Sequence, residues 1–401
     1  MIFNLSSLLR AYYSCRKGKR NSNHALYCEL DYEDTLHILS TALREKSYEI
    51  GTSSCFVISY PTIREIFAAY FNDRIIHHLL IMYIQDEIDK KFIFDSLACR
   101  KNKGGLLGVQ RTSSFLNKIT HNNTSKAYYL KMDIRSFFYS IDKDILAQIL
   151  LKDLSKLPMP TKDIDDLTWL SMKIIYHNPC QDFELQGDKT LLQLLPKGKS
   201  LFTIPKKKGL AIGNLTSQFF ANLYLNEVDQ FIKRQLKIKY YLRYADDMLL
   251  ISNNIKELQK AEKLTENFLL EKLKLNTKKE KTTYGSVYQG IDFVGYVIRP
   301  EYILSRNRTV GNLKKKLHYF NNGFLINRRF CIEEAVQIKL PPSKEDLESI
   351  CTSINSTFGH LRWSNSYRLR KNIYEKHFGI LKSYLEPQDS YKFFRPIVPT
   401  P

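Results

Sequence analysis

Two adjacent acids, Asp246 and Asp247, lie inside the apolar stretch YYLRYADDMLLIS at residues 240–252. The segments on either side have the composition of short β-strands, so the acids would lie at the tip of a hairpin. A solvent turn is the simple alternative, because Asp tolerates turn geometry and hydrogen-bonds its own backbone. Solvent turns more often contain Gly or Asn, however, and adjacent carboxylates in a cleft repel each other unless a cation lies between them. The pair therefore predicts a cation site that uses a third acid.

The candidate for the third acid is Asp133, in the stretch AYYLKMDIRSFFYSID at residues 127–142. Residues 128–132 are predicted to form a strand, with Asp133 at its exit. Three acids from two neighbouring strands can hold two divalent ions about 3.5–4 Å apart, an arrangement that supports in-line phosphoryl transfer. One ion would activate an attacking 3′ hydroxyl, and the other would stabilise a pyrophosphate leaving group. The alternative for Asp133 is a helix N-cap.

Composition narrows the class of partner. The chain has 401 residues, 43% of them hydrophobic, which is enough for a large core divided into two or three subdomains. Its 61 Lys and Arg against 41 Asp and Glu leave a net charge of +20, which favours a polyanionic partner. No apolar run approaches the roughly 18 residues that a membrane span needs, and the N-terminal pattern is not that of a signal peptide. Seven scattered cysteines without a CxxC pair favour neither disulfides nor zinc and fit a reducing cytoplasm.

Hydrophobic periodicity gives a coarse map of the elements that must position the acids. Residues 1–60 are predicted to be a helical lead-in, followed by a strand broken at Pro61 and then a long helix. A glycine-containing loop at residues 209–213 opens a further helix. GIDFVGYVI at residues 290–298 is typical of a β-hairpin. The chain from about residue 305 onward is basic and helical in pattern.

Five motifs in this order resemble those of reverse transcriptases: REIFAAYFNDRIIHH, KMDIRSFF, GLAIGNLTSQ, YADD and GIDFVGY. The resemblance covers roughly residues 55–305. It implies an α+β fold, a right-hand polymerase with an antiparallel palm sheet, helical fingers and a basic helical thumb. The domains expected on this basis are a helical lead-in at 1–60, fingers and palm at 55–305, and a thumb at 306–401.

The resemblance also implies roles for the acids. Asp133 and Asp246 would be the principal metal ligands and Asp247 the third acid, with the backbone carbonyl of Ile134 near a metal. The ions would be two Mg²⁺, with Mn²⁺ as an alternative.

Further residues would bind the nucleotide. Phe138 matches the aromatic gate that excludes a ribose 2′-OH, and its competing interpretation is plain core. Arg64 resembles the fingers arginine on the triphosphate. Ile212 and Gln218 would lie against the forming base pair. A lysine near the pyrophosphate would be Lys278 or one of its neighbours, Lys279 and Lys281. The primer and template would contact the hairpin residues Gly290, Phe293, Gly295 and Tyr296.

Finer features resemble reverse transcriptases of diversity-generating retroelements, because IGNLTSQ at residues 212–218 lacks a proline after the serine. Such enzymes copy a template-repeat RNA, misread adenines and work with a small basic accessory protein. The partners implied are an RNA template, a DNA or RNA primer and dNTPs, in the cytoplasm of a bacterial or phage-infected cell and without a membrane. A retron-like or abortive-infection enzyme is one alternative, and a non-polymerising RNA-binding or splicing factor is another. Ala211 departs from the proline common in the family, and no RNase H-like acids follow residue 305.

Overall fold

The chain forms two compact units, each assembled from two separate segments in the computed structural model. The first unit contains Met1–Gly104 and Leu130–Tyr284, and the second contains Gly105–Tyr129 and Gly285–Pro401. Within the described part of the chain, no helix is long and apolar enough to cross a membrane. The structure describes residues 2–19, 23–60, 62–323, 325–331, 334–339 and 343–397.

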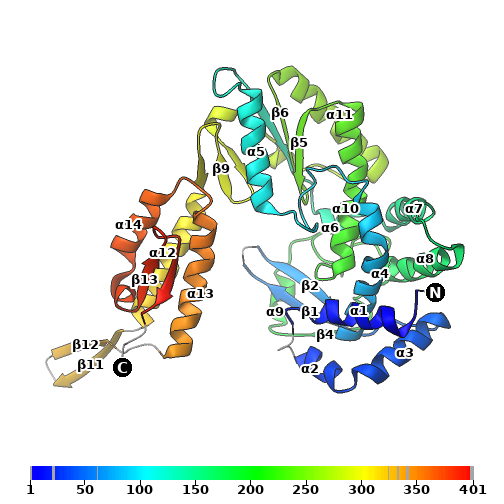
Figure 1. The fold of residues 1–401 in the computed structure, drawn as a ribbon, viewed down its shortest axis with the longest axis horizontal. Coiled ribbons are helices and arrows are strands. Elements are labelled where there is room, and N and C mark those ends of the chain that lie inside the picture. The colour runs from blue at the N-terminus through cyan, green and yellow to red at the C-terminus, as the bar shows by residue number, and fades with distance from the viewer. Residues whose placement is uncertain are drawn as a thin grey trace. The chain divides into compact units, whose positions relative to one another are not determined.

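The first unit is rich in helices, which surround two small sheets (Figure 1). Its helices are α1 (Leu5–Arg16), α2 (Asn23–Leu30), α3 (Tyr32–Arg44), α4 (Phe71–Asp89), α6 (Phe137–Ser140), α7 (Lys143–Leu154), α8 (Thr161–Tyr176), α9 (Thr190–Gln193), α10 (Leu215–Gln230) and α11 (Ile255–Leu273). Its strands are β1 (Ser53–Ile58), β2 (Arg64–Ala69), β4 (Phe183–Leu185), β5 (Tyr240–Tyr244) and β6 (Asp247–Ser252), together with β3 (Tyr128–Met132) and β7 (Thr283–Ser286), which cross the boundary between the units.

A four-stranded sheet with the order β5-β6-β3-β7 carries the predicted acids. Strands β5 and β6 are antiparallel, with Tyr241 opposite Leu250 and Tyr244 opposite Asp247. The central residues of both strands are buried on both faces, which explains why their sequence is a continuous apolar run rather than an alternating one. Helix α11 contacts β6 and α10, so the apolar strands are covered by helix (Figure 1).

The second sheet of this unit has the order β2-β1-β4. Strands β1 and β2 are antiparallel, running from the pair Ser53 and Ala69 to the pair Ile58 and Arg64, and β4 joins β1 in parallel. The sequence predicted one strand, a break at Pro61 and a long helix. The helix is α4, but the residues before it form a second strand, and Pro61 lies outside the described residues.

The second unit combines one helix from the middle of the chain with the C-terminal segment (Figure 1). Its helices are α5 (Gly105–Ile119), α12 (Asn307–Gly323), α13 (Lys344–Leu361) and α14 (Tyr367–His377). Its strands are β8 (Ile291–Phe293), β9 (Tyr296–Ile298), β10 (Ile303–Ser305), β11 (Leu325–Cys331), β12 (Glu334–Lys339), β13 (Leu385–Gln388) and β14 (Phe393–Pro396). Helices were expected in this region, whereas the antiparallel pairs β11–β12 and β13–β14 were not predicted.

The largely aliphatic core of the second unit includes three aromatic rings, Phe358, Phe378 and Phe394, which are in mutual contact. The β8–β9 hairpin belongs to this unit because α5 contacts β9 and the Tyr296 ring stacks on His360 of α13, with centroids 4.2 Å apart. The units therefore divide the chain differently from the predicted domains, which ended fingers and palm at residue 305. The mixture of helices and antiparallel strand pairs confirms the α+β class.

Candidate active site

Asp133 lies directly after β3, whose residues Leu130 and Met132 are buried in the core. The carboxylate is itself buried, with 6% of the residue exposed. Its backbone carbonyl accepts a hydrogen bond from the amide of Lys278 at 2.7 Å. Asp133 caps no helix, because α6 begins at Phe137 behind Ser136. The acid is therefore fixed at the exit of a buried strand, as the sequence predicted.

Asp246 and Ala245 form the two-residue turn between β5 and β6, and Asp247 begins β6 opposite Tyr244. Ala245 has a φ of 54°, the left-handed conformation that such turns require. The simple turn interpretation is thus correct for the backbone. It does not exclude a cation site, because the turn brings its carboxylates to Asp133.

The electrostatics of the turn reflect this proximity. Burial first, and then the neighbouring charge of Asp133, raise the pKa of Asp246 to about 6. Burial also raises the pKa of Asp247, against the lowering effect of the Lys131 ammonium. Both shifts show that the ionised carboxylates are disfavoured in this site. A divalent cation bound between them would relieve their repulsion.

Two lysines neutralise the acids. Lys281 Nζ lies 2.5 Å from Asp133 Oδ2, and Lys131 Nζ lies 3.6 Å from Asp247 Oδ1. Sequence reasoning did not single out Lys131, although strand alternation places residues 131 and 133 on the same face of β3. Among the three lysines offered for the pyrophosphate, the structure brings Lys281 to the carboxylates, whereas Lys278 contributes its backbone amide.

The donor set fits a divalent ion in chemical type, because carboxylate oxygens are the ligands that Mg²⁺ prefers. Asp133 is close enough to Asp246 for its charge to raise the pKa of Asp246. Over the described residues, no group of three or more His, Cys, Asp or Glu side chains is gathered tightly enough to hold a metal ion. Asp247 forms an ion pair with Lys131. The backbone of Ile134 pairs with Thr277 through the flanking residues, so its own carbonyl points away from that partner.

Arg243, which is 1% exposed, supports the turn between β5 and β6. Its guanidinium forms a buried ion pair with Asp229 of α10, at 2.7 Å between Nη2 and Oδ2. It also donates to the carbonyl of Ala245 at 2.8 Å and to the hydroxyl of Ser96 at 2.9 Å. Tyr241 donates to the same Asp229 carboxylate at 2.6 Å. This network ties the acid-bearing turn to α10. The sequence feature that could have revealed this network is Arg243 itself, a charged residue inside an otherwise apolar strand.

The loop at residues 209–214 is held between α6 and β2. The amide of Leu210 donates to the carbonyl of Phe138 at 2.8 Å, and the amide of Phe67 donates to the carbonyl of Ile212 at 2.9 Å. Phe138 is half-buried, whereas the preceding Phe137 is buried. The Phe138 ring thus keeps an accessible face beside the loop.

Two other nucleotide candidates come from neighbouring elements. Arg64 is the exposed first residue of β2, and its Nε donates to Thr62 Oγ1 at 3.1 Å. Gln218 is exposed on the first turns of α10. Ile212, in the loop that opens α10, is half-buried. All three belong to the first unit, together with the acids.

The predicted primer hairpin lies in the second unit. Phe293 and Tyr296 pair across a two-residue turn, with Gly295 at a φ of 90° and Gly290 at 96°. Phe293 is fully buried, and the Tyr296 hydroxyl donates to the carbonyl of His360 at 2.9 Å. These two side chains stabilise the unit, and the tip residues Val294 and Gly295 are half-buried, with His360 Nε2 3.3 Å from the carbonyl oxygen of Gly295.

Residues 61–298 match the family described as reverse transcriptase (RNA-dependent DNA polymerase). This match spans more than half of the chain, which therefore belongs to the reverse transcriptase family, a family of nucleotidyltransferases. No curated protein matches the sequence.

Solved structures of telomerases show a distant likeness. Apo telomerase from Candida tropicalis is 12% identical, with a TM-score of 0.48, over 83% of this chain and 58% of that one. Telomerase from Candida albicans, in complex with a TWJ fragment of telomeric RNA, is 13% identical, with a TM-score of 0.42, over 87% of this chain and 63% of that one. The chain thus spans less than two thirds of each of these telomerase chains.

Proposed function

We propose that this protein copies an RNA template into DNA by nucleotidyl transfer from dNTPs. The observation that carries the proposal is the convergence of two carboxylates, the buried Asp133 at the end of β3 and the half-buried Asp246 in the β5–β6 turn. Like charges held close together and partly withdrawn from water are destabilising unless a cation compensates them, and this chain retains both. That cost argues against a non-polymerising RNA-binding or splicing factor.

Each residue of the site would have a distinct task. Two Mg²⁺ ions, held by Asp133 and Asp246 with Asp247 and the Ile134 carbonyl nearby, would activate the primer 3′ hydroxyl and stabilise the leaving pyrophosphate. Lys281 would exchange its contact with Asp133 for the phosphate oxygens of the nucleotide. Arg64 would bind the triphosphate through its guanidinium fork. Phe138 would lie against the sugar and exclude a 2′ hydroxyl.

The catalytic assignment is tested by Asp133→Asn and Asp246→Asn. Each should reduce extension of a DNA primer on an RNA template by at least about 1,000-fold, because electrostatic stabilisation at the reacting phosphate is lost. Binding of the RNA–DNA duplex should change little, since its affinity is spread over many Lys and Arg contacts.

Asp165→Asn, at an exposed position of α8, is the matched control and should extend primers at the parental rate. Extension by Asp133→Asn or Asp246→Asn within tenfold of the parent would refute the assignment. A parental protein that binds duplex but extends no primer, with either Mg²⁺ or Mn²⁺, would favour the RNA-binding alternative.

More specifically, we propose that this protein performs error-prone copying of a template-repeat RNA in a diversity-generating retroelement. The support is the motif IGNLTSQ without a following proline, whose Ile212 and Gln218 bracket the loop and helical turn beside Phe138. A pocket that grips the base pair loosely discriminates by only about 1–3 kcal/mol. A retron-like or abortive-infection role in defence, in the same cytoplasmic setting, is the alternative.

The two roles differ in their error spectrum. A defined RNA should be copied with and without a co-expressed small basic accessory protein, and the cDNA sequenced. Errors opposite template adenine should exceed those opposite each of the other bases. Equal error rates at all four bases in both conditions would favour the defence alternative while leaving the polymerase assignment intact. A near-repeat pair in neighbouring DNA that differs at adenines would be independent support.

A further inference from the structure

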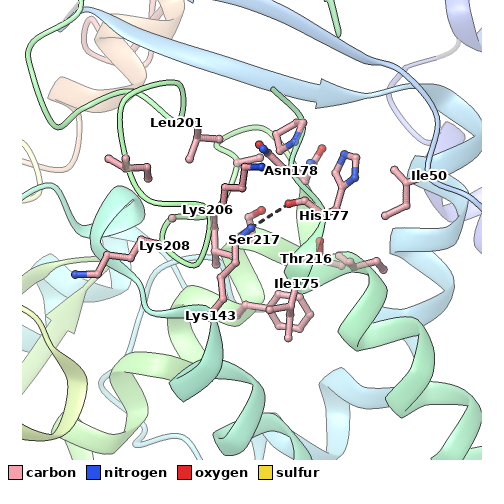
Figure 2. A pocket seen from close by; sticks show the side chains of 18 of the residues that line it. Ile50, Lys143, Ile175, His177, Asn178, Leu201, Lys206, Lys208, Thr216 and Ser217 are labelled. Atoms are coloured by element: carbon pink, nitrogen blue, oxygen red, sulfur yellow. Dashed lines mark hydrogen bonds between the residues drawn. The ribbon is translucent and has the colours of Figure 1, made fainter. Parts of the chain in front are cut away.

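A small cavity lies in the first unit, beside the loop at residues 209–214. Its volume is about 50 Å³, and it is bounded by α7, α8, the loop at residues 201–211 and the start of α10 (Figure 2). Its described lining includes three lysines and two histidines, but neither Asp nor Glu. The predicted catalytic chemistry uses none of these basic residues.

Lys143, the first residue of α7, is the principal charge of the cavity and only 4% exposed. Its ammonium donates to the backbone carbonyl of His177 at 3.0 Å, the contact drawn as a dashed line in Figure 2. Within the described chain this is its one hydrogen-bond partner, although an ammonium has three donors. Burial lowers the pKa of Lys143 to about 8, the direction expected for a cation withdrawn from water.

Two more polar residues of the lining are His177 and Ser217. The Nε2 atom of His177 is buried and makes no hydrogen bond to any described residue. Ser217, on α10, is 6% exposed. The acid that acts on His177 is Asp182, which does not line the cavity and accepts a hydrogen bond from Thr52 at 2.8 Å. The cavity thus holds unmet hydrogen-bonding capacity and net positive charge.

We propose that this cavity binds a small oxyanion of the size of inorganic phosphate. A water needs about 10–15 Å³ of such volume, so the cavity has room for roughly three to five water-sized groups. A single phosphate has that size, whereas pyrophosphate or a nucleoside triphosphate is too large. The anion would accept hydrogen bonds from Lys143, His177 and Ser217, and it would neutralise the buried ammonium. Lys206, an exposed residue that also lines the cavity, stands at its edge.

Binding can be measured without polymerase activity. The probe is inorganic phosphate, titrated at constant ionic strength against a chloride background, with calorimetry and the thermal unfolding midpoint as readouts. Phosphate should bind the parent with saturation and raise its unfolding midpoint. Lys143→Met should weaken phosphate binding at least about tenfold, because a hydrogen bond to a charged group is lost. Lys152→Met, exposed at the other end of α7, is the matched control and should bind as the parent does.

Ser217→Ala provides a second variant should Lys143→Met fold poorly, and it should weaken phosphate binding severalfold while keeping the fold. Pyrophosphate and dATP, tested in the absence of a divalent metal, should not compete with phosphate. The proposal is overturned if the parent shows no phosphate-specific saturation, which would mean that the cavity holds water only. Equal phosphate binding by the parent and Lys143→Met would overturn it too.

Discussion

Arg243 and Asp229 illustrate how a residue outside the reacting groups can decide the geometry of the site. Their ion pair is withdrawn from solvent, with exposed side-chain fractions of 1% and 0%. A buried pair adds little net stability by itself, because the desolvation of both charges offsets their attraction. Its value here is positional, since the same guanidinium holds the carbonyl of Ala245 within the acid-bearing turn.

Arg243→Met should destabilise the protein by about 3–5 kcal/mol, because it leaves the Asp229 carboxylate buried without a partner. The free energy of unfolding, measured by urea titration, is the appropriate readout. Arg243→Met combined with Asp229→Leu should recover much of the loss, as both charges are then removed.

Arg135→Met is the matched control, because Arg135 pairs with Glu280 at 3.2 Å in an exposed position. An exposed pair is screened by water, so this variant should unfold at the parental urea midpoint. A loss for Arg243→Met no larger than that of Arg135→Met would contradict the proposed role of the buried pair.

At the scale of elements, the loop at residues 209–214, which hydrogen-bonds to both α6 and β2, requires a glycine. Gly213 has a φ of 134°, and a Cβ at this position would lie 2.6 Å from the carbonyl oxygen of Phe67. That oxygen belongs to the backbone of a sheet strand and cannot move aside as a flexible side chain could. The close approach of loop and strand is therefore possible only for glycine.

Gly213→Ala should displace the loop and lower kcat/KM for dNTP incorporation by about 10- to 100-fold, because small misplacements of positioning groups are costly. Gly104→Ala is the control that distinguishes steric collision from backbone strain. Gly104 also has a positive φ, of 149°, but a Cβ there would meet no atom within 4 Å. In steady-state primer extension, the kcat/KM of Gly104→Ala should be close to that of the parent. Parental kinetics for Gly213→Ala would show that the loop does not position the nucleotide.

Elements with strong local patterns were predictable. The helices α4, α10 and α11 carry long apolar-periodic stretches, and the strands β3, β5 and β6 are apolar and bounded by polar residues. The pairs β11–β12 and β13–β14 were missed, because they interrupt a basic stretch whose neighbouring segments have helical periodicity. Short strands are stabilised by partners across the sheet rather than by their own composition, so local patterns identify them poorly.

At the scale of the whole molecule, the net charge of +20 belongs to a chain divided into two compact units. Distributed Lys and Arg contacts make affinity for a nucleic acid strongly dependent on salt and insensitive to the loss of any one side chain. This is the physical reason why the carboxylate variants should lose extension while retaining duplex binding. The division between the units at residue 285 assigns the β8–β9 hairpin to the unit that contains α12, α13 and α14.

The sequence by itself determined the three acids, their order along the chain, the strands that bear them and the sign of the net charge. These properties depend on residue type and on periodicities of two or 3.6 residues, which are local. Only the tertiary structure decided that Lys281 contacts Asp133, that Lys131 forms an ion pair with Asp247, and that the buried Lys143 donates to the carbonyl of His177. Lys281–Asp133 and Lys143–His177 join residues 148 and 34 positions apart, and Asp247 lies on a different strand from Lys131. Such contacts depend on how distant elements pack, which no local pattern records.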